Sequence, residues 1–229
     1  MIILRIVFDL DDTLANSWEA ARKGIKELLK FFFKKRMFKL VILMLFRKNE
    51  EFVKDESLLL DDPYRIIKKF IEFCYRKSDP KTVQKADDIF NKAFYSHFRL
   101  YPEAKIVLEK LKDHELVLIT DGDSEYQRKK IKFLDIEKYF KEIYISGETK
   151  ISKNNPEAFK IIKRADYMIG DRIKTDIEGG KFIGAKTILF ENGLFIKENR
   201  KSDVKPDYVI KDLRDILNII PDPPLDQKQ

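Results

Sequence analysis

The sequence predicts an α/β protein whose core is a doubly wound parallel sheet, with a block of helices inserted after the first strand. Residues 2–8 form an apolar run that is typical of a buried parallel strand. From residue 102 onward, short apolar strands alternate with amphipathic helices. Between these regions, residues 17–96 have no strand signal and repeat apolar side chains at helical spacing.

The individual elements of the core follow from this pattern. Strands are expected at residues 116–119, 142–146, 167–169, 187–190 and 208–210. Helices are expected at residues 102–113, 124–134, 156–164, 174–183 and 213–219, and the first and third of them carry proline in the first turn. These elements and the first strand predict a Rossmann-like core made of residues 1–16 and 97–220. The helical insertion covers residues 17–96, and the proline-rich residues 221–229 are expected to be disordered.

Length and composition narrow the class of protein. A chain of 229 residues can bury a sizeable core. The N-terminal apolar run is too short for a secretory signal, and the longest uninterrupted apolar stretch, Leu40 to Phe46, has seven residues, against ~20 for a membrane-spanning helix. The single cysteine, Cys74, can form neither an intramolecular disulfide nor a thiolate metal site. We therefore expect a cytoplasmic protein without a transmembrane segment.

The net charge of +7 is concentrated in one segment. Residues 28–49 contain seven Lys or Arg and no acidic residue, so the rest of the chain is balanced and no nucleic-acid partner is expected. Residues 28–48 also carry five phenylalanines, which favours a helix pair that packs its apolar side chains inward and keeps its lysines in water. An oligomer contact, an apolar lip facing the substrate and peripheral contact with an anionic membrane are the alternatives. A monomer and a homodimer are both compatible with the sequence.

The most informative residues follow the first strand. Asp9 and Asp11 are two apart in an extended chain, so both can face one pocket while Leu10 turns into the core. Ligands in open α/β sheets bind beyond the carboxyl ends of the strands. Two converging carboxylates repel each other unless a cation or a shared proton relieves them, and Mg²⁺ prefers such carboxylates together with waters and a phosphate. The competing interpretation is a turn followed by a helix cap, because Asp and Thr are favoured at both.

Polar residues also follow later strands. Thr120 closes the second strand and Gly122 comes just after it, which places a hydroxyl and free backbone amides at one edge of the sheet. Lys153 lies in a loop before a helix, where a cation can neutralise a phosphate and a nucleophile. Asp171 follows a further strand, and Asp176 lies five residues beyond it. Taken together, these residues predict a metal and phosphate site.

In order and spacing, these residues resemble the four motifs of the haloacid dehalogenase superfamily of aspartyl-phosphate hydrolases. The first motif is similar to Phe8 to Leu14 (Phe-Asp-Leu-Asp-Asp-Thr-Leu), and the second is similar to Leu118 to Thr120. The third corresponds to Lys153, and the fourth is similar to Gly170 to Asp176 (Gly-Asp-Arg-Ile-Lys-Thr-Asp). The helical insertion resembles the cap that follows the first motif in this superfamily.

The resemblance implies a chemical role for each acid. Asp9 would attack phosphorus to form an aspartyl phosphate, and Asp11 would protonate the leaving oxygen and then activate water. Mg²⁺ would be held by Asp9, by Asp11 through its backbone carbonyl, by Asp171, and by Asp176 directly or through water. Dehalogenases and phosphonate hydrolases of the superfamily lack the second acid, so Asp11 favours a phosphate ester as substrate.

The resemblance also implies a phosphate-binding set. Thr120, Asp121 and the backbone of Gly122 would contact phosphate, and Lys153 would pair with both phosphate and the nucleophile, so Thr120 and Lys153 are expected among the catalytic residues. Two residues depart from the family pattern: Asp121 stands where Asn is frequent, and Asn154 follows the lysine where Pro is common. These departures bear on phosphate affinity and on the geometry of the lysine loop.

The predicted function is therefore a Mg²⁺-dependent phosphatase, a phosphoric monoester hydrolase, that acts on a small phosphorylated metabolite. A phosphomutase that uses the same aspartyl phosphate is one alternative. A non-enzymatic ligand-binding or regulatory protein on this fold is the other, because fold does not fix function. The presence of both Asp9 and Asp11 argues against the second alternative.

Overall fold

A computed structural model describes residues 3–45, 62–192 and 195–221 of the chain. The chain forms two compact units, one made of Met1–Asn16 with Leu100–Gln229 and the other of Ser17–Arg99. The predicted disordered tail lies outside the described residues from residue 222 onward, as do residues 46–48 of the basic aromatic segment. None of the helices in the described ranges is both long and apolar enough to cross a membrane.

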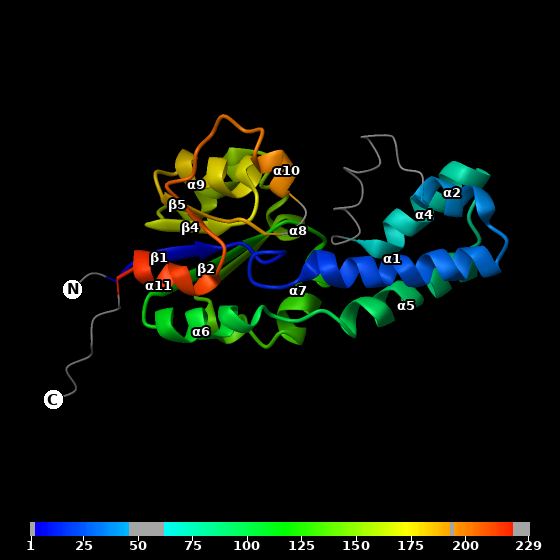
Figure 1. The fold of residues 1–229 in the computed structure, drawn as a ribbon, viewed down its shortest axis with the longest axis horizontal. Coiled ribbons are helices and arrows are strands. Elements are labelled where there is room, and N and C mark those ends of the chain that lie inside the picture. The colour runs from blue at the N-terminus through cyan, green and yellow to red at the C-terminus, as the bar shows by residue number, and fades with distance from the viewer. Residues whose placement is uncertain (1–2, 46–61, 193–194, 222–229) are drawn as a thin grey trace. The chain divides into compact units, whose positions relative to one another are not determined.

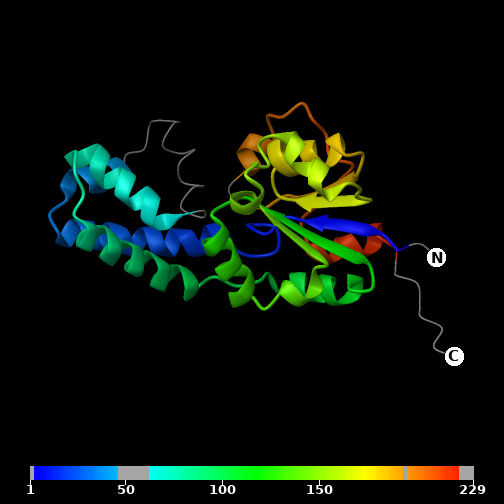
Figure 2. The same ribbon diagram turned by 180° about the vertical axis from the view of Figure 1, so that it is seen from behind.

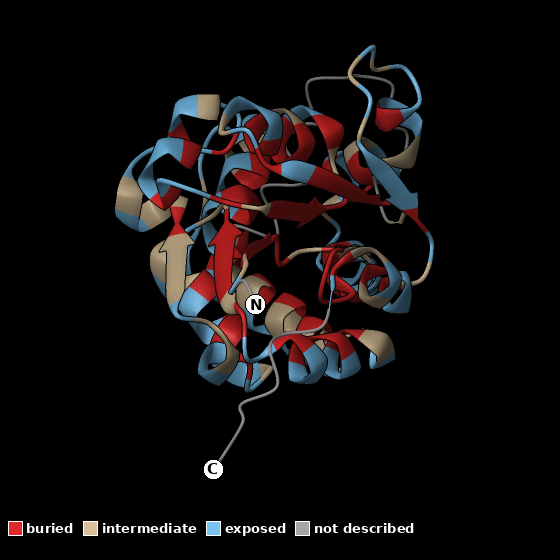
Figure 3. Cartoon of the chain, turned by 90° about the vertical axis from the view of Figure 1, so that its left-hand side faces the viewer, coloured by how far each residue is buried: buried red, intermediate tan, exposed pale blue. Residues whose placement is uncertain are grey.

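The first unit is built on a single sheet of six parallel strands, in the order β3-β2-β1-β4-β5-β6. The strands are β1 (Arg5–Phe8), β2 (Glu115–Thr120), β3 (Glu142–Ile145), β4 (Tyr167–Gly170), β5 (Lys186–Phe190) and β6 (Tyr208–Ile210). Figure 3 shows buried residues along the central strands. Both faces of these strands are covered, which is why their sequences are continuous apolar runs. The predicted doubly wound parallel sheet is confirmed.

Alternate residues of the strands supply two different cores. Ile6 and Phe8 of β1 belong to a core that includes α6 (Pro102–Leu111) and α11 (Ile216–Ile219). Val7, between them, packs in a second core with Phe159 on the opposite face. Figure 1 shows α6 and α11 on one side of the sheet and α9 (Glu178–Phe182) on the other. This layering leaves the carboxyl ends of the strands as the place where polar side chains can gather.

The remaining helical elements of this unit are short. They are α7 (Ser124–Phe133), η2 (Glu137–Tyr139), α8 (Ser146–Thr149), η3 (Pro156–Ile162), η4 (Ile173–Ile177), α10 (Ile196–Asn199) and η5 (Leu213–Asp215). Three of them differ from the sequence prediction, because residues 156–162 form a 3₁₀ helix, residue 146 begins α8 instead of ending a strand, and the helix expected at 174–183 starts with a π-helical turn. In that turn both Asp176 N and Ile177 N donate to Arg172 O, at 2.9 and 3.4 Å.

The second unit is entirely helical in its described part. It contains α1 (Ser17–Lys34), α2 (Phe38–Leu45), α4 (Pro63–Tyr75) and α5 (Pro80–Tyr95). Figures 1 and 2 both show α1 and α5 side by side. Gly24 of α1 permits this contact, since a Cβ there would lie 2.5 Å from Cδ2 of Phe90 on α5. Asp62 and Asp79 cap α4 and α5, each of which begins with proline.

Candidate active site

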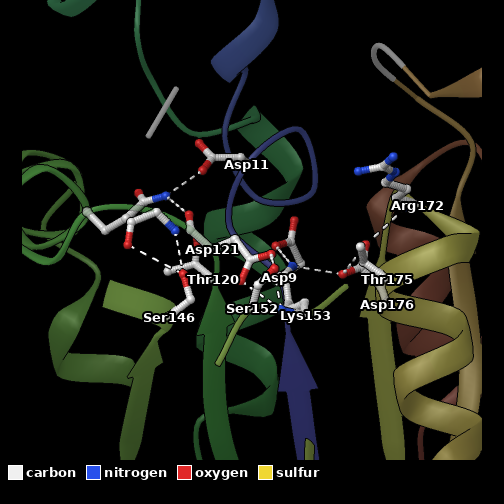
Figure 4. Close-up of polar contacts among 12 residues, drawn as sticks. Asp9, Asp11, Thr120, Asp121, Ser146, Ser152, Lys153, Arg172, Thr175 and Asp176 are labelled. Carbon is white, nitrogen blue, oxygen red and sulfur yellow. Dashed lines mark hydrogen bonds and ion pairs between the residues drawn. The ribbon is translucent and has the colours of Figure 1, made fainter. Parts of the chain in front are cut away.

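The candidate active site lies at the carboxyl ends of three neighbouring strands. Because β1 lies between β2 and β4, Asp9 at the end of β1 has Thr120 of β2 on one side (Figure 4). Asp171, just after β4, lies on the other side. The backbone N–H of Asp9 donates to Ile169 O at 2.9 Å and fixes the residue to the sheet. Asp12 then turns the chain with a φ of 60°, a conformation that Asp tolerates better than most residues.

A buried cluster of three carboxylates and one ammonium forms the centre of the site. Oxygen atoms of Asp9, Asp171 and Asp176 lie within 4.8 Å of one another, and all three side chains are buried. The Lys153 Nζ atom donates to Asp9 Oδ1 at 2.5 Å and to Asp176 Oδ1 at 2.8 Å. Lys153 is itself only 5% exposed, so these charges meet away from water. The structure thus brings together four of the residues that the sequence predicted.

The charges of this cluster are not balanced. Burial raises the pKa of Asp9 to about 7; Lys153 opposes this shift and Asp176 adds to it. Burial, and then the charges of neighbouring carboxylates, raise the pKa of Asp171 well above its ordinary value. Burial alone would lower the pKa of Lys153, but the carboxylates of Asp176 and Asp9 hold that pKa well above its ordinary value. One ammonium among three acids leaves excess negative charge, which a divalent cation would relieve.

The donor atoms of the cluster fit Mg²⁺. Asp171 Oδ2 is buried and has no hydrogen-bond partner among the described residues, as expected for an oxygen directed at a cation. Carboxylate oxygens are the ligands that this hard ion prefers. Asp176 is held in place because its Oδ2 accepts from Arg172 N at 3.1 Å. Gly170 allows this arrangement, since a Cβ there would lie 2.3 Å from Asp176 Cβ.

Asp11 lies outside the three-carboxylate cluster, and its side chain has different partners. Lys130 Nζ lies 2.7 Å from Asp11 Oδ1 and 2.8 Å from Oδ2, and Gln127 Nε2 donates to Oδ2 at 3.0 Å. The Lys130 side chain is fully buried, whereas the Asp11 side chain is 17% exposed. The Asp11 carboxylate therefore has its partners on α7 and is not one of the three clustered carboxylates.

The end of β2 departs from one sequence expectation. Thr120 is buried, with its hydroxyl 3.5 Å from Asp121 O, which is the limit of a hydrogen bond. The amide of Gly122 is not free, because it donates to the hydroxyl of Ser146 at 2.8 Å. Ser146 follows β3 and was not singled out from the sequence, although it stands at a strand end like the predicted residues. Phosphate binding by Gly122 N would require this hydroxyl to move.

Three further residues support the site without having been identified from the sequence. Lys130 and Gln127 lie one turn apart on α7 and contact Asp11. Neither residue belongs to a sequence motif that would have identified it. Asn199 stabilises the turn after β4 through two hydrogen bonds to its backbone. Its Nδ2 donates to Asp171 O at 2.6 Å and its Oδ1 accepts from Ile173 N at 2.9 Å. Lysines and asparagines are usually exposed, so composition alone gives no reason to place these side chains in the interior.

Comparisons with known proteins agree with this geometry. The family model of haloacid dehalogenase-like hydrolases matches residues 6–190. The chain is 26% identical to the glyceraldehyde 3-phosphate phosphatase of Pyrococcus furiosus over 94% of its own length and 92% of the relative. It is 25% identical to the human N-acylneuraminate-9-phosphatase, with 92% of this chain and 91% of the relative covered.

Solved structures share the fold. A 2-haloacid dehalogenase from Pseudomonas syringae superposes with a TM-score of 0.61 at 22% identity and covers 95% of this chain and 98% of its own. The resemblance inferred from the four motifs is confirmed by the family model, which spans the first strand through the fifth. The chain belongs to the haloacid dehalogenase-like hydrolase family.

Proposed function

We propose that this protein is a Mg²⁺-dependent phosphatase that hydrolyses a small phosphorylated metabolite through an aspartyl phosphate on Asp9. The observation that carries the proposal is the buried Asp9 carboxylate, which pairs with Lys153 and lies within 4.8 Å of oxygen atoms of Asp171 and Asp176. Relatives named as phosphatases over nearly their whole length support this class of enzyme.

The proposed reaction has two steps. An oxygen of Asp9 attacks phosphorus while the bond to the leaving oxygen breaks, and protonated Asp11 gives its proton to that oxygen. Asp11, now a carboxylate, takes a proton from a water molecule, which attacks phosphorus and releases inorganic phosphate. This step restores Asp9 as a carboxylate and Asp11 as an acid. The ammonium of Lys153 offsets the charge of Asp9, so that an anionic phosphate can approach it.

Asp9, Asp171 and Asp176, with the backbone carbonyl of Asp11, are the groups that would hold Mg²⁺. When bound, Mg²⁺ supplies positive charge to the phosphate oxygens and reduces repulsion between phosphate and nucleophile. We also propose that the hydroxyl of Thr120 contributes to phosphate binding from the neighbouring strand end. The helices of Ser17–Arg99 are proposed to serve as the cap that sets substrate preference.

The proposal can be tested by hydrolysis of a panel of phosphate esters with and without Mg²⁺. The panel should contain glyceraldehyde 3-phosphate and N-acylneuraminate 9-phosphate, which the names of the relatives suggest, and sugar phosphates of intermediate size. We expect Mg²⁺-dependent release of inorganic phosphate, with at least ~10³-fold lower turnover in Asp9→Asn. Transfer of phosphate to a second position of the same substrate, without release, would indicate a mutase. Substantial turnover by folded Asp9→Asn would contradict the covalent mechanism.

A further inference from the structure

The side chain of Asp121 binds the loop that carries Lys153. Asp121 Oδ1 accepts from the backbone N–H of Lys153 at 2.9 Å, and Oδ2 lies 3.2 Å from the same nitrogen. Oδ2 also accepts from the hydroxyl of Ser152 at 2.8 Å. Figure 4 shows Asp121 next to Ser152 and Lys153 at the end of β2. Asp121, which the family resemblance placed in the phosphate-binding set, therefore uses both carboxylate oxygens for hydrogen bonds within the protein.

The loop has few other attachments. Residues 152–155 lie between α8 and η3 and have no helix or strand of their own. Among the described residues, Asn154 and Asn155 donate their backbone amides back to Ser152, at 3.2 and 2.9 Å. These bonds shape the loop but do not join it to the sheet. Asp121 is thus the described residue whose hydrogen bonds join the backbone of Lys153 to the end of a strand.

The position of this backbone decides what the Lys153 ammonium can reach. Its Nζ atom contacts two carboxylates from different elements, Asp9 after β1 and Asp176 in η4, with distances of 2.5 and 2.8 Å. A long side chain that must meet two partners tolerates little displacement of its own backbone. A misplacement of ~1 Å in such a site can reduce catalysis by ~10²-fold.

We propose that Asp121 is a positioning residue that anchors Lys153 so that its ammonium reaches both Asp9 and Asp176. This inference rests on the proposed phosphatase function. An aspartate suits the task because its carboxylate offers two acceptors and no donor, whereas the loop presents one N–H and one O–H. Asparagine can keep the bond from Lys153 N and can donate its amide to the Ser152 oxygen, since a hydroxyl both donates and accepts.

This reasoning predicts a graded series. Asp121→Ala should lower kcat by ~10- to 100-fold with less than a ~3-fold change in KM, because Lys153 is displaced. Asp121→Asn should stay within ~5-fold of wild type. The matched control is Asp123→Ser, which removes a carboxylate two residues away; serine can still cap α7 by accepting from Tyr126 N, so kcat should be unchanged.

A double-mutant cycle separates positioning from direct phosphate binding. In a Lys153→Ala background, Asp121→Ala should cause almost no further loss, because the residue through which it acts is absent. Full additivity of the two losses would overturn the proposal. Unchanged kcat in Asp121→Ala would overturn it too, and so would unchanged kcat in Lys153→Ala.

A measurement that does not depend on activity completes the test. Amide hydrogen exchange of Lys153 should be slow in wild type and Asp123→Ser, faster in Asp121→Ala, and intermediate in Asp121→Asn. Circular dichroism is the check that each variant is folded. Fast exchange at Lys153 in wild type would contradict the anchor even if the phosphatase function holds. If no ester is hydrolysed while the exchange pattern is as predicted, the phosphatase proposal fails and the anchor stands.

Discussion

Replacing Asp171 by asparagine should make the metal-free protein more stable and remove its response to Mg²⁺. The substitution keeps the shape of the side chain and removes one negative charge from a cluster with three carboxylates and a single ammonium. Stabilisation is expected because the pKa of Asp171, raised well above its ordinary value by burial and by neighbouring acids, reports an unfavourable charge in the folded state.

The size of the effect follows from the geometry. Carboxylate oxygens in the cluster lie within 4.8 Å of one another. At an effective dielectric constant of ~20, two unit charges at this distance repel by ~3.5 kcal/mol. Asp171 has two such neighbours, but the ammonium of Lys153 and partial protonation of the cluster offset much of the repulsion. We expect Asp171→Asn to raise the free energy of unfolding by ~1–3 kcal/mol at pH 8 without metal.

The assay is urea unfolding followed by circular dichroism at pH 8, first with a chelator and then with Mg²⁺. At ~100 times its dissociation constant, Mg²⁺ should add ~2.7 kcal/mol to the unfolding free energy of wild type and almost nothing to that of Asp171→Asn. Asp113→Asn, at an exposed position of the same unit, is the matched control and should behave as wild type. A metal-free Asp171→Asn protein less stable than wild type, or one that keeps the Mg²⁺ increment, would refute this reasoning.

Three further predictions concern neighbouring residues. Burial raises the pKa of Asp9 to about 7, so between pH ~4 and ~7 the folded metal-free protein keeps a proton that the unfolded chain has already released. As pH rises through this range, the unfolding free energy of wild type should therefore fall relative to that of Asp9→Asn by up to ~1.4 kcal/mol per pH unit. Equal pH slopes of the two proteins in urea unfolding would exclude a raised Asp9 pKa. Gly170→Ala should displace Asp176, whose Cβ lies 2.3 Å from the added atom, and weaken Mg²⁺ binding by at least ~10-fold in calorimetry; unchanged affinity would show that the turn adjusts freely. Lys130→Met should lower the unfolding free energy by ~1–3 kcal/mol because Asp11 loses its buried cation, and a variant as stable as wild type would mean that the pair contributes nothing.

The sequence predicted the parts of the site that follow from strand ends. Asp9, Thr120 and Asp171 could be placed together because parallel strands end at one edge of a sheet and buried strands are readable as apolar runs. Lys153 was different: its loop position made it a candidate cation for phosphate, but nothing in that loop distinguishes it from a solvated lysine, and the resemblance to a family was needed to pair it with Asp9. Its burial against two carboxylates supplies the physical reason that the sequence alone could not.

Side chains that act through tertiary packing could not be predicted. Lys130 looks like an exposed helix residue, yet it is fully buried against Asp11, which lies 119 residues away in the chain. The family resemblance placed Asp121 in the phosphate-binding set, but the fold places the Lys153 amide next to it. The local helix geometry could not be predicted either. The π-helical turn at residues 173–177 depends on hydrogen bonds to Arg172 O, and the spacing of apolar residues does not distinguish such a turn from an α-helical one.

The most direct test of the proposed mechanism is chemical identification of the phosphorylated residue. Asp11→Asn should accumulate the intermediate, because an activated aryl phosphate needs no proton on its leaving oxygen whereas hydrolysis of the aspartyl phosphate needs the Asp11 base. The protein is mixed with this ester and Mg²⁺, quenched, and treated with borohydride, which reduces an aspartyl phosphate to homoserine that peptide mass spectrometry can locate. We predict homoserine at position 9, dependent on ester and absent from Asp9→Asn. Homoserine at another position, or stoichiometric release of the aryl alcohol with position 9 unmodified, would contradict the mechanism.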